Sequence, residues 1–188
     1  MILYLNACVR EESRTDRLAR YLLARLAGPV KEVRLTDLGF PKADAAFLSA
    51  RDKLVAESAF SDPMFDAARE FAAADTIVLA APFWDLSFPA AVKQYFEQIN
   101  VVGITFFYTP DGIPQGLCRA KKLYYVTTAG GTIFSEDYGY GYVQALAKGF
   151  YGIEETELIK AEGLDVIGAD EQEILGRAES AIAARFPA

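Results

Sequence analysis

The sequence predicts an α/β fold in which one parallel β-sheet is covered by helices on both faces. Two observations favour this class. Short apolar segments such as residues 77–81 recur along the chain, separated by longer segments with apolar residues at helical spacing. Most of the apolar segments do not alternate with polar residues, so both faces of these strands are expected to be buried, as in parallel sheets.

The amino-terminal third predicts a strand, a helix and a second strand. Residues 1–7 are apolar apart from Asn6 and form the first strand. Ser13 is a suitable N-cap, and leucines follow it at intervals of four residues, which predicts a helix that runs to Ala27. Residues 30–35 alternate apolar and charged side chains, as expected of a strand nearer the edge of the sheet.

A long connection comes next. Residues 36–60 contain a turn and a short helix at residues 49–59, and they form either a lid or dimer contact or a peripheral excursion. The following helix begins at Asp62-Pro63, an N-cap with proline at the first helical position. It leads into the central strand at residues 77–81.

The central strand is followed by an unusual loop. Pro82 ends the strand because proline has no N–H for the ladder, and the next helix is expected to begin at Pro89. Between them lie Phe83 and Trp84, where a surface loop is normally polar. These aromatic residues either line a ligand site at the carboxyl end of the strand or plug the top of the core.

The carboxyl-terminal half completes the sheet. A short aromatic strand is expected at residues 104–108, and residues 134–142 are expected to form a mobile loop with Gly139 and Gly141 as hinges. The remaining elements are strands at residues 123–127 and 157–160 and helices at residues 143–151 and 170–185. This order, with a length of 188 residues, indicates a flavodoxin-like five-stranded parallel sheet in a single domain spanning residues 1–188.

Composition excludes several classes of function. A net charge of −7 without any basic stripe argues against a nucleic-acid partner. No apolar run reaches the roughly 18 residues that span a bilayer, and no secretory leader pattern is present, so no membrane partner and a cytoplasmic location are expected.

Cys8 and Cys118 are expected to be ordinary thiols. The chain has no histidine, which removes Ser-His and Cys-His catalysis and the usual zinc sites. Any enzyme activity must use other side chains or a cofactor.

Three loops that follow buried strands are expected at one edge of the sheet. The first carries Ser13, Arg14 and Thr15 at a helix N-terminus, where free N–H groups favour a phosphate, although Ser13 alternatively serves only as a cap. The second is the aromatic loop after Pro82. The third ends in Gly130-Gly131, which either lets backbone approach a planar ligand or forms a simple turn. A phosphate end, an aromatic wall and a backbone-lined edge together suit flavin mononucleotide (FMN).

Four motifs resemble the flavodoxin-like NAD(P)H:quinone oxidoreductases, especially the FMN-dependent azoreductase branch. They are SRT at residues 13–15, APFWDLSFPAAVKQYFEQI at residues 81–99, GITFFYTPDGIPQGL at residues 103–117 and TTAGG at residues 127–131. The resemblance covers nearly the whole chain. It implies FMN as the cofactor, NADH or NADPH as the electron donor, and a homodimer.

The resemblance also implies a set of site residues. They are Ser13, Arg14 and Thr15 for the phosphate; Pro82, Phe83, Trp84, Asp85 and Leu86 for the flavin ring; Thr128, Ala129, Gly130 and Gly131 for the ring edge; and Phe106 and Tyr108 for the substrate pocket of the neighbouring subunit. No catalytic side chain and no metal are implied, because the flavin carries the chemistry.

The chain departs from the family at several positions. Asp85 stands where azoreductases commonly have asparagine, and a carboxylate beside a flavin is expected to lower its potential. Ala7 and Ala129 replace residues that are often serine and arginine. The mammalian quinone reductases use a Tyr–His pair, and this chain has no histidine. These departures leave substrate preference open more than cofactor binding.

The expected function is that of an FMN-dependent NAD(P)H oxidoreductase. It transfers two electrons to quinones, azo compounds or similar small-molecule acceptors by a ping-pong mechanism. The first alternative is a flavodoxin-type one-electron carrier, which the acidic charge fits but the additional segments at residues 36–60 and 103–116 do not. The second is a non-catalytic flavin-binding protein, favoured by the departures at Asp85 and Ala129.

Overall fold

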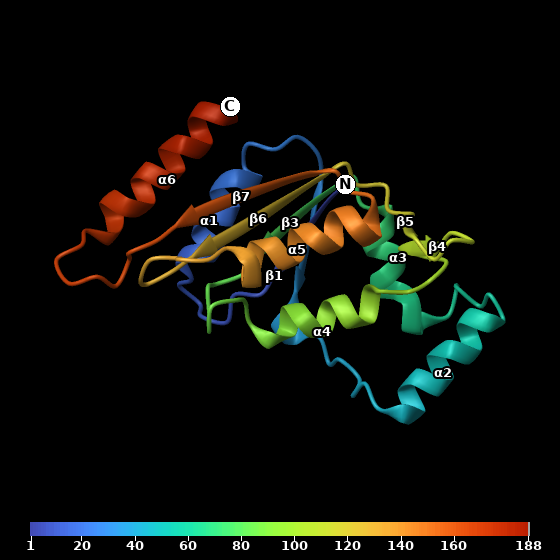
Figure 1. Cartoon of the computed structure of the whole chain (residues 1–188). Coiled ribbons are helices and arrows are strands. Elements are labelled where there is room, and N and C mark those ends of the chain that lie inside the picture. The colour runs from blue at the N-terminus through green and yellow to red at the C-terminus, as the bar shows by residue number, and fades with distance from the viewer. Residues whose placement is uncertain (188) are drawn as a thin grey trace.

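Five parallel strands form the central sheet of the computed structural model, which describes residues 1–187 (Figure 1). They are β1 (Ile2–Asn6), β2 (Val30–Arg34), β3 (Thr76–Ala80), β6 (Lys122–Thr128) and β7 (Glu155–Ala161). The strand order is β2-β1-β3-β6-β7, the order of a flavodoxin-like sheet. The predicted fold class is therefore confirmed, and β2 lies at an edge as its alternating sequence indicated.

Helices cover both faces of this sheet (Figure 1). One face carries α1 (Arg14–Leu23) and α6 (Glu171–Arg185); the other carries α3 (Asp66–Ala73), α4 (Ala90–Ile99) and α5 (Tyr142–Leu146), while α2 (Ala45–Ala56) lies to one side. Short 3-10 segments, η1 (Leu35–Asp37) and η2 (Pro63–Phe65), and π-helical segments, η3 (Asp137–Gly141) and η4 (Ala147–Tyr151), complete the helical elements. Across residues 1–187, no helix is both long and apolar enough to cross a membrane.

Alternate side chains of each inner strand enter two different cores. In β1, Leu3 and Leu5 pack into the core beneath α3, α4 and α5, whereas Ile2 and Tyr4 pack into the core beneath α1 and α6. The same alternation continues through β3 and β6. An apolar run without alternation is what a strand with two buried faces requires, so the sequence pattern and the packing agree.

Side-chain caps set the starts of several helices. Ser13 Oγ accepts a hydrogen bond from the N–H of Asp16 at 3.3 Å, and Asp62 and Asp170 cap η2 and α6 in the same way. The end of α1 differs from the prediction: the helix stops at Leu23 rather than Ala27. The residues that follow form i to i−3 hydrogen bonds, such as Leu26 N–H to Leu23 C=O, which tighten the last turn.

Two other predicted helix starts were wrong. Helix α2 begins at Ala45 rather than at residue 49, because Asp44 accepts hydrogen bonds from the N–H groups of Ala46 and Phe47. Helix α4 begins at Ala90, and Pro89 is its N-cap with an extended backbone instead of its first helical residue. Both errors are shifts of a boundary and leave the order of elements intact.

The predicted strand at residues 104–108 belongs to a separate hairpin. Strand β4 (Phe106–Tyr108) pairs antiparallel with β5 (Pro114–Gly116) and makes no ladder with the central sheet. A turn joins the two strands, with Gly112 N–H donating to Thr109 C=O at 2.9 Å. The aromatic segment after α4 is therefore one strand of a separate two-stranded sheet.

The predicted hinged loop at residues 134–142 was wrong from Asp137 onward. Gly139 and Gly141 lie inside η3, which continues directly into α5 and η4. Gly139 is buried, and Ser87 Oγ donates a hydrogen bond to the Tyr138 carbonyl. The segment is therefore a helical wall anchored to the loop after β3.

Candidate functional site

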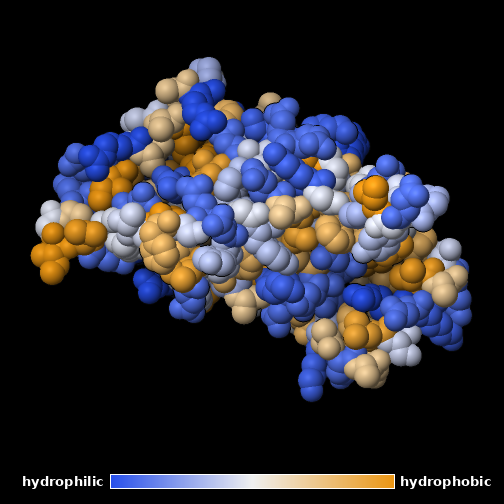
Figure 2. Space-filling view, viewed as in Figure 1, coloured by the Kyte–Doolittle hydropathy of each residue, from blue (hydrophilic) through white to orange (hydrophobic). Residues whose placement is uncertain are grey.

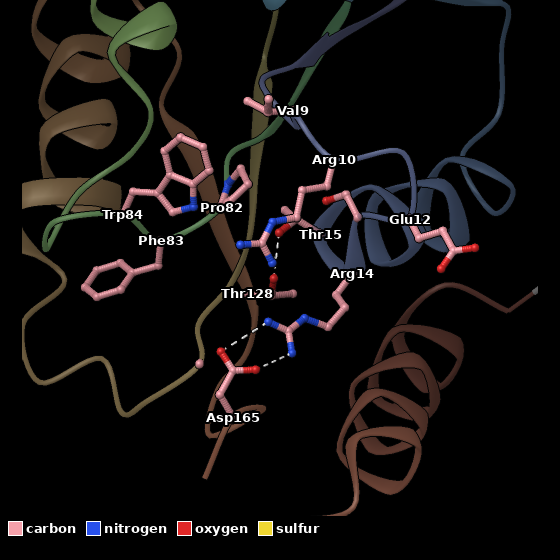
Figure 3. A pocket seen from close by; sticks show the side chains of 12 residues that line it. Val9, Arg10, Glu12, Arg14, Thr15, Pro82, Phe83, Trp84, Thr128 and Asp165 are labelled. Atoms are coloured by element: carbon pink, nitrogen blue, oxygen red, sulfur yellow. Dashed lines mark hydrogen bonds and ion pairs between the residues drawn. The ribbon is translucent and has the colours of Figure 1, made fainter.

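The loops that follow β1, β3 and β6 line one cavity at the carboxyl edge of the sheet (Figure 3). Its volume is about 130 Å³, and it is lined by Val9, Arg10, Glu12, Ser13, Arg14, Thr15, Pro82, Phe83, Trp84, Thr128, Gly130 and Asp165. Enclosed small-molecule sites usually have volumes of roughly 300–1,000 Å³. A ligand larger than a phosphate and its neighbouring atoms must therefore extend out of the cavity along its rim.

The N-terminus of α1 forms the polar end of this cavity. Thr15 is buried, and its hydroxyl lies 2.6 Å from that of Thr128, which joins the helix to β6. The first-turn N–H groups of α1 lack helical partners, apart from the one that Ser13 caps, and they carry the positive end of the helix dipole. With the guanidinium groups of Arg10 and Arg14 nearby, this end of the cavity suits an anion.

A polar network around the buried side chain of Asn6 fixes the loop that leads into α1. Asn6 Oδ1 accepts a hydrogen bond from Cys8 N–H at 2.9 Å, and Asn6 Nδ2 donates to Asp16 at 3.0 Å and to Glu32 at 2.8 Å. The Tyr4 hydroxyl also donates to Asp16. Asn6 thus holds the loop to α1 and β2, which keeps the anion-binding end in place.

The aromatic wall comes from a tight turn after β3. Trp84 and Ser87 exchange two backbone hydrogen bonds, at 3.1 and 2.7 Å, and the two residues between them have positive φ. Asp85 has φ of 50° and Leu86 has φ of 68°, the backbone of a type I′ turn. A left-handed leucine is a strained residue of the kind found at functional sites. The turn presents Trp84, which is 40% exposed, at the rim of the cavity.

The third side of the cavity is backbone. Gly130 lies against the side chain of Asp165, and a Cβ atom added to Gly130 would stand 2.1 Å from Asp165 Oδ2. A larger residue at this position would therefore displace the Asp165 side chain. The carboxylate of Asp165 in turn accepts hydrogen bonds from Arg14, which hold the pKa of Asp165 below its usual value.

Neither thiol is suited to nucleophilic chemistry. Cys8 and Cys118 are buried and unpaired, as predicted. Burial raises the pKa of Cys8 to about 11 and that of Cys118 to about 12, so both stay protonated near neutral pH. Neither thiol therefore supplies a thiolate nucleophile near neutral pH.

Comparison with known proteins decides the family. Residues 1–186 match the family described as having a flavodoxin-like fold, Flavodoxin_2. An FMN-dependent NADH:quinone oxidoreductase of Clostridium perfringens is 35% identical over 181 residues, which cover 92% of this chain and 90% of that protein. The corresponding protein of Coprothermobacter proteolyticus is 34% identical over 184 residues, covering 90% and 89%.

This chain belongs to the flavodoxin-like fold family. A solved azoreductase from Bacillus anthracis superposes with a TM-score of 0.84 at 24% identity, covering 98% of this chain and 97% of the other. An FMN-dependent NADH-azoreductase of the same species, solved in complex with FMN, gives a TM-score of 0.78 at 23% identity, covering 98% and 96%. The resemblance inferred from the motifs is thus confirmed, and these structures show the same fold.

The cavity of this flavodoxin-like protein gathers many of the predicted residues. Eight of the twelve predicted cofactor residues line it: Ser13, Arg14, Thr15, Pro82, Phe83, Trp84, Thr128 and Gly130. Asp85, Leu86, Ala129 and Gly131 lie in the same loops but do not line the cavity. Ala129 is buried, whereas Asp85, Leu86 and Gly131 are exposed.

The two predicted substrate residues lie in the β4–β5 hairpin, away from this cavity. Phe106 is only 4% exposed and packs edge-on against Phe150 with ring centroids 4.7 Å apart. Tyr108 packs against Phe106 and is 52% exposed. Within one subunit, Phe106 therefore supports the hairpin, while Tyr108 is the residue free to contact another molecule.

Asp165 was not among the site residues predicted from the sequence. This residue follows β7, the last strand, and the carboxyl end of a parallel strand meets the same edge of the sheet as the three loops considered. This position after the last strand is the feature from which the sequence could have indicated Asp165 as a site residue. Val9 and Glu12 were also missed as lining residues, although they flank the predicted phosphate loop.

The donors and walls of the site fit FMN. A helix N-terminus with two hydroxyls and two guanidinium groups matches a phosphate, and Trp84 offers a flat apolar surface beside it. On the third wall, Gly130 exposes its backbone beside the Asp165 carboxylate. The site can therefore anchor the phosphate of a planar ligand at one end, and it leaves an open rim at the other end.

Proposed function

We propose that this flavodoxin-like protein is an FMN-dependent oxidoreductase that uses NADH, or NADPH, to reduce quinones, azo compounds or similar acceptors. The observation that carries the proposal is the single cavity that joins the α1 N-terminus to Trp84 and Gly130. The names of the relatives from Clostridium perfringens and Coprothermobacter proteolyticus support FMN, NADH and quinones. We also propose that residues 1–188 form one FMN-binding domain with a cytoplasmic location, which the two free thiols support.

The side chains of the cavity take distinct roles in this proposal. Ser13, Arg14 and Thr15 hold the phosphate, because their donors surround the N-terminus of α1. Phe83 and Trp84 supply the wall beside the flavin ring, and Gly130 supplies close backbone at its edge. FMN held by these residues would supply the redox chemistry, which is hydride uptake from the nicotinamide and two-electron reduction of the acceptor.

Asp85, Leu86, Ala129 and Gly131 complete the proposed binding loops. The I′ turn holds Asp85 and Leu86 exposed beside Trp84, where they would meet the cofactor from outside the cavity. The backbone of Ala129 and Gly131 flanks Gly130 in the chain, where it would meet the ring edge. These residues contribute position and backbone rather than an acid or base.

Steady-state kinetics test the enzyme proposal. One open rim beside Trp84 must admit donor and acceptor in turn, so the oxidised nicotinamide must leave before the acceptor enters. Initial rates measured with NADH or NADPH against a quinone or an azo dye should therefore give parallel double-reciprocal lines. Intersecting lines would contradict the shared rim, and no turnover of any acceptor with FMN-loaded protein would contradict the enzyme proposal itself.

We propose that the active protein is a homodimer with two-fold symmetry. The β4–β5 hairpin and its flanks expose Val102, Phe107, Tyr108, Ile113 and Leu117, each at least 37% exposed, and Figure 2 shows hydrophobic side chains over this region. Exposed apolar groups gathered on one segment mark an interaction surface. The small enclosed volume at the α1 N-terminus also leaves the rim to be covered by another molecule. Tyr108 is the substrate-pocket residue that the partner would receive, with Phe106 behind it.

Sedimentation tests the dimer. The wild-type protein should sediment at twice the mass of 20.6 kDa, and replacing Phe107 and Ile113 together by aspartate should produce a monomer with impaired turnover. The matched control replaces Val166 and Ile167 by aspartate. Both residues are exposed on the loop between β7 and α6, and this variant should remain dimeric. A wild-type monomer with full activity would contradict the proposal.

A further inference from the structure

A carboxylate lies at the anion-binding end of the cavity. Asp165 Oδ1 accepts a hydrogen bond from Arg14 Nη1 at 2.7 Å, and Asp165 Oδ2 accepts a longer one from Arg14 Nη2 at 3.4 Å (Figure 3). The same Nη1 also donates to Glu171 at 3.2 Å. The proposed phosphate ligand Arg14 thus already has a two-point contact with a carboxylate, the geometry that it would offer to a phosphate.

Backbone hydrogen bonds fix the position of this carboxylate. The N–H groups of Gly163, Leu164 and Asp165 donate to the carbonyls of Gly131, Ala129 and Gly130 at 3.0, 3.2 and 2.9 Å. The loop after β7 is therefore bound, residue by residue, to the loop after β6. Because Gly130 has no Cβ, the Asp165 side chain fills the space beside it. The backbone that carries Asp165 is consequently fixed beside Gly130, within reach of Arg14 at the start of α1.

The charges of the cavity wall balance without a ligand. Two guanidinium groups, on Arg10 and Arg14, and two carboxylates, on Glu12 and Asp165, line the cavity. The Glu12 carboxylate points away from Arg14 in Figure 3, whereas the Asp165 carboxylate points at it. A phosphate dianion that enters this end meets the Asp165 carboxylate. That carboxylate is already bonded to Arg14, the residue proposed to bind the phosphate.

We propose that Asp165 competes with the cofactor phosphate for Arg14 and thereby sets how tightly FMN is held. The inference rests on the proposed FMN function and adds a residue that opposes binding. When the phosphate enters, Arg14 exchanges its bonds to Asp165 for bonds to the phosphate, and the two anions repel each other. The site therefore binds FMN less tightly than its donors alone would allow. Riboflavin has no phosphate, so it does not meet this competition.

The test is the substitution D165N, which removes the charge and keeps the shape. Titration of cofactor-free protein, followed by quenching of flavin fluorescence, gives dissociation constants for FMN and for riboflavin. We expect D165N to bind FMN on the order of tenfold more tightly, as for one unit charge acting on a dianion at short range in a largely aqueous site. Riboflavin affinity should stay unchanged. Because Asp165 is 65% exposed in its side chain, the variant should fold, and its thermal midpoint should be recorded alongside.

The substitution E171Q is the matched control. Glu171 also accepts a hydrogen bond from Arg14, but it does not line the cavity, so its loss should change FMN affinity much less than D165N does. Weaker FMN binding by D165N, or an equal change for FMN and riboflavin, would overturn the competition while leaving FMN binding intact. Wild-type protein that binds neither flavin would overturn both this inference and the proposed function.

Discussion

Replacing Ser13 and Thr15 together by alanine should weaken FMN binding by roughly 3–6 kcal/mol, because each lost hydrogen bond to a charged phosphate costs roughly 1.5–3 kcal/mol. Ser13 caps α1, and Thr15 joins α1 to Thr128 across the cavity, so both hydroxyls stand at the anion-binding end. The expected loss corresponds to about 10²- to 10⁴-fold in the dissociation constant. Fluorescence titration with FMN measures it directly.

A single substitution separates phosphate binding from capping at Ser13. In S13D, a carboxylate replaces the hydroxyl, and aspartate is as good an N-cap as serine. The thermal midpoint should therefore be preserved, whereas FMN binding should be lost through repulsion between two anions. A variant that binds FMN like the wild type would show that Ser13 only caps the helix.

Replacing Gly116 by alanine should destabilise the fold by about 3 kcal/mol, the upper range for overpacking a filled site. A Cβ at Gly116 would lie 2.0 Å from the carbonyl carbon of Tyr151 and 2.2 Å from the nitrogen of Gly152. Both contacts are to backbone, so no side-chain rotation relieves them, and the β4–β5 hairpin must separate from η4. Urea unfolding followed by circular dichroism measures the change in the free energy of unfolding.

Gly176 provides the control for this substitution. It lies inside α6, and an added Cβ would meet nothing within 4 Å beyond the adjacent residues and backbone of its own helix, so G176A should raise the free energy of unfolding by roughly 0.5–1 kcal/mol. The free energy of unfolding should therefore fall in G116A and rise in G176A. Equal stability of G116A and the wild type would show that the hairpin is not held against η4 as the structure has it.

The order of elements was predictable because burial on two faces leaves a strong mark on the sequence. The central strand, β3, reads as an unbroken apolar run, and Asp62 and Asp170 stand where N-caps are needed. Helix boundaries were less predictable. The early start of α2 depends on which of several polar residues caps it, and no residue of α2 is buried to give the helix an apolar face.

Two elements were not predicted from the sequence, and the physical reasons differ. Strand β5 has the sequence PQG, which has low strand propensity, and it exists because β4 pairs with it and η4 packs on it. The segment at residues 137–141 has two glycines, which predict a loop, yet its helical form is held by burial of Gly139 and by the bond from Ser87. In both cases tertiary contacts override local preference.

The site was predictable where it follows from the ends of neighbouring strands. Loops after β1, β3 and β6 were expected together, and the cavity joins them. Asp165 was not anticipated, because its role depends on the side-chain length of Arg14 and on the space beside Gly130. Contacts of that kind depend on distances between loops that the sequence does not contain.

Anaerobic titration of the FMN-loaded protein with NADH tests the central proposal most directly. The flavin absorbance should bleach in one step after one equivalent of NADH, because hydride delivery carries two electrons, and a quinone added afterwards should restore it. The flavin extracted from the protein should co-elute with FMN rather than FAD. Bleaching that stops after one electron, as in an electron carrier, or a flavin that NADH does not reduce, would contradict the assignment of this protein as a two-electron FMN oxidoreductase.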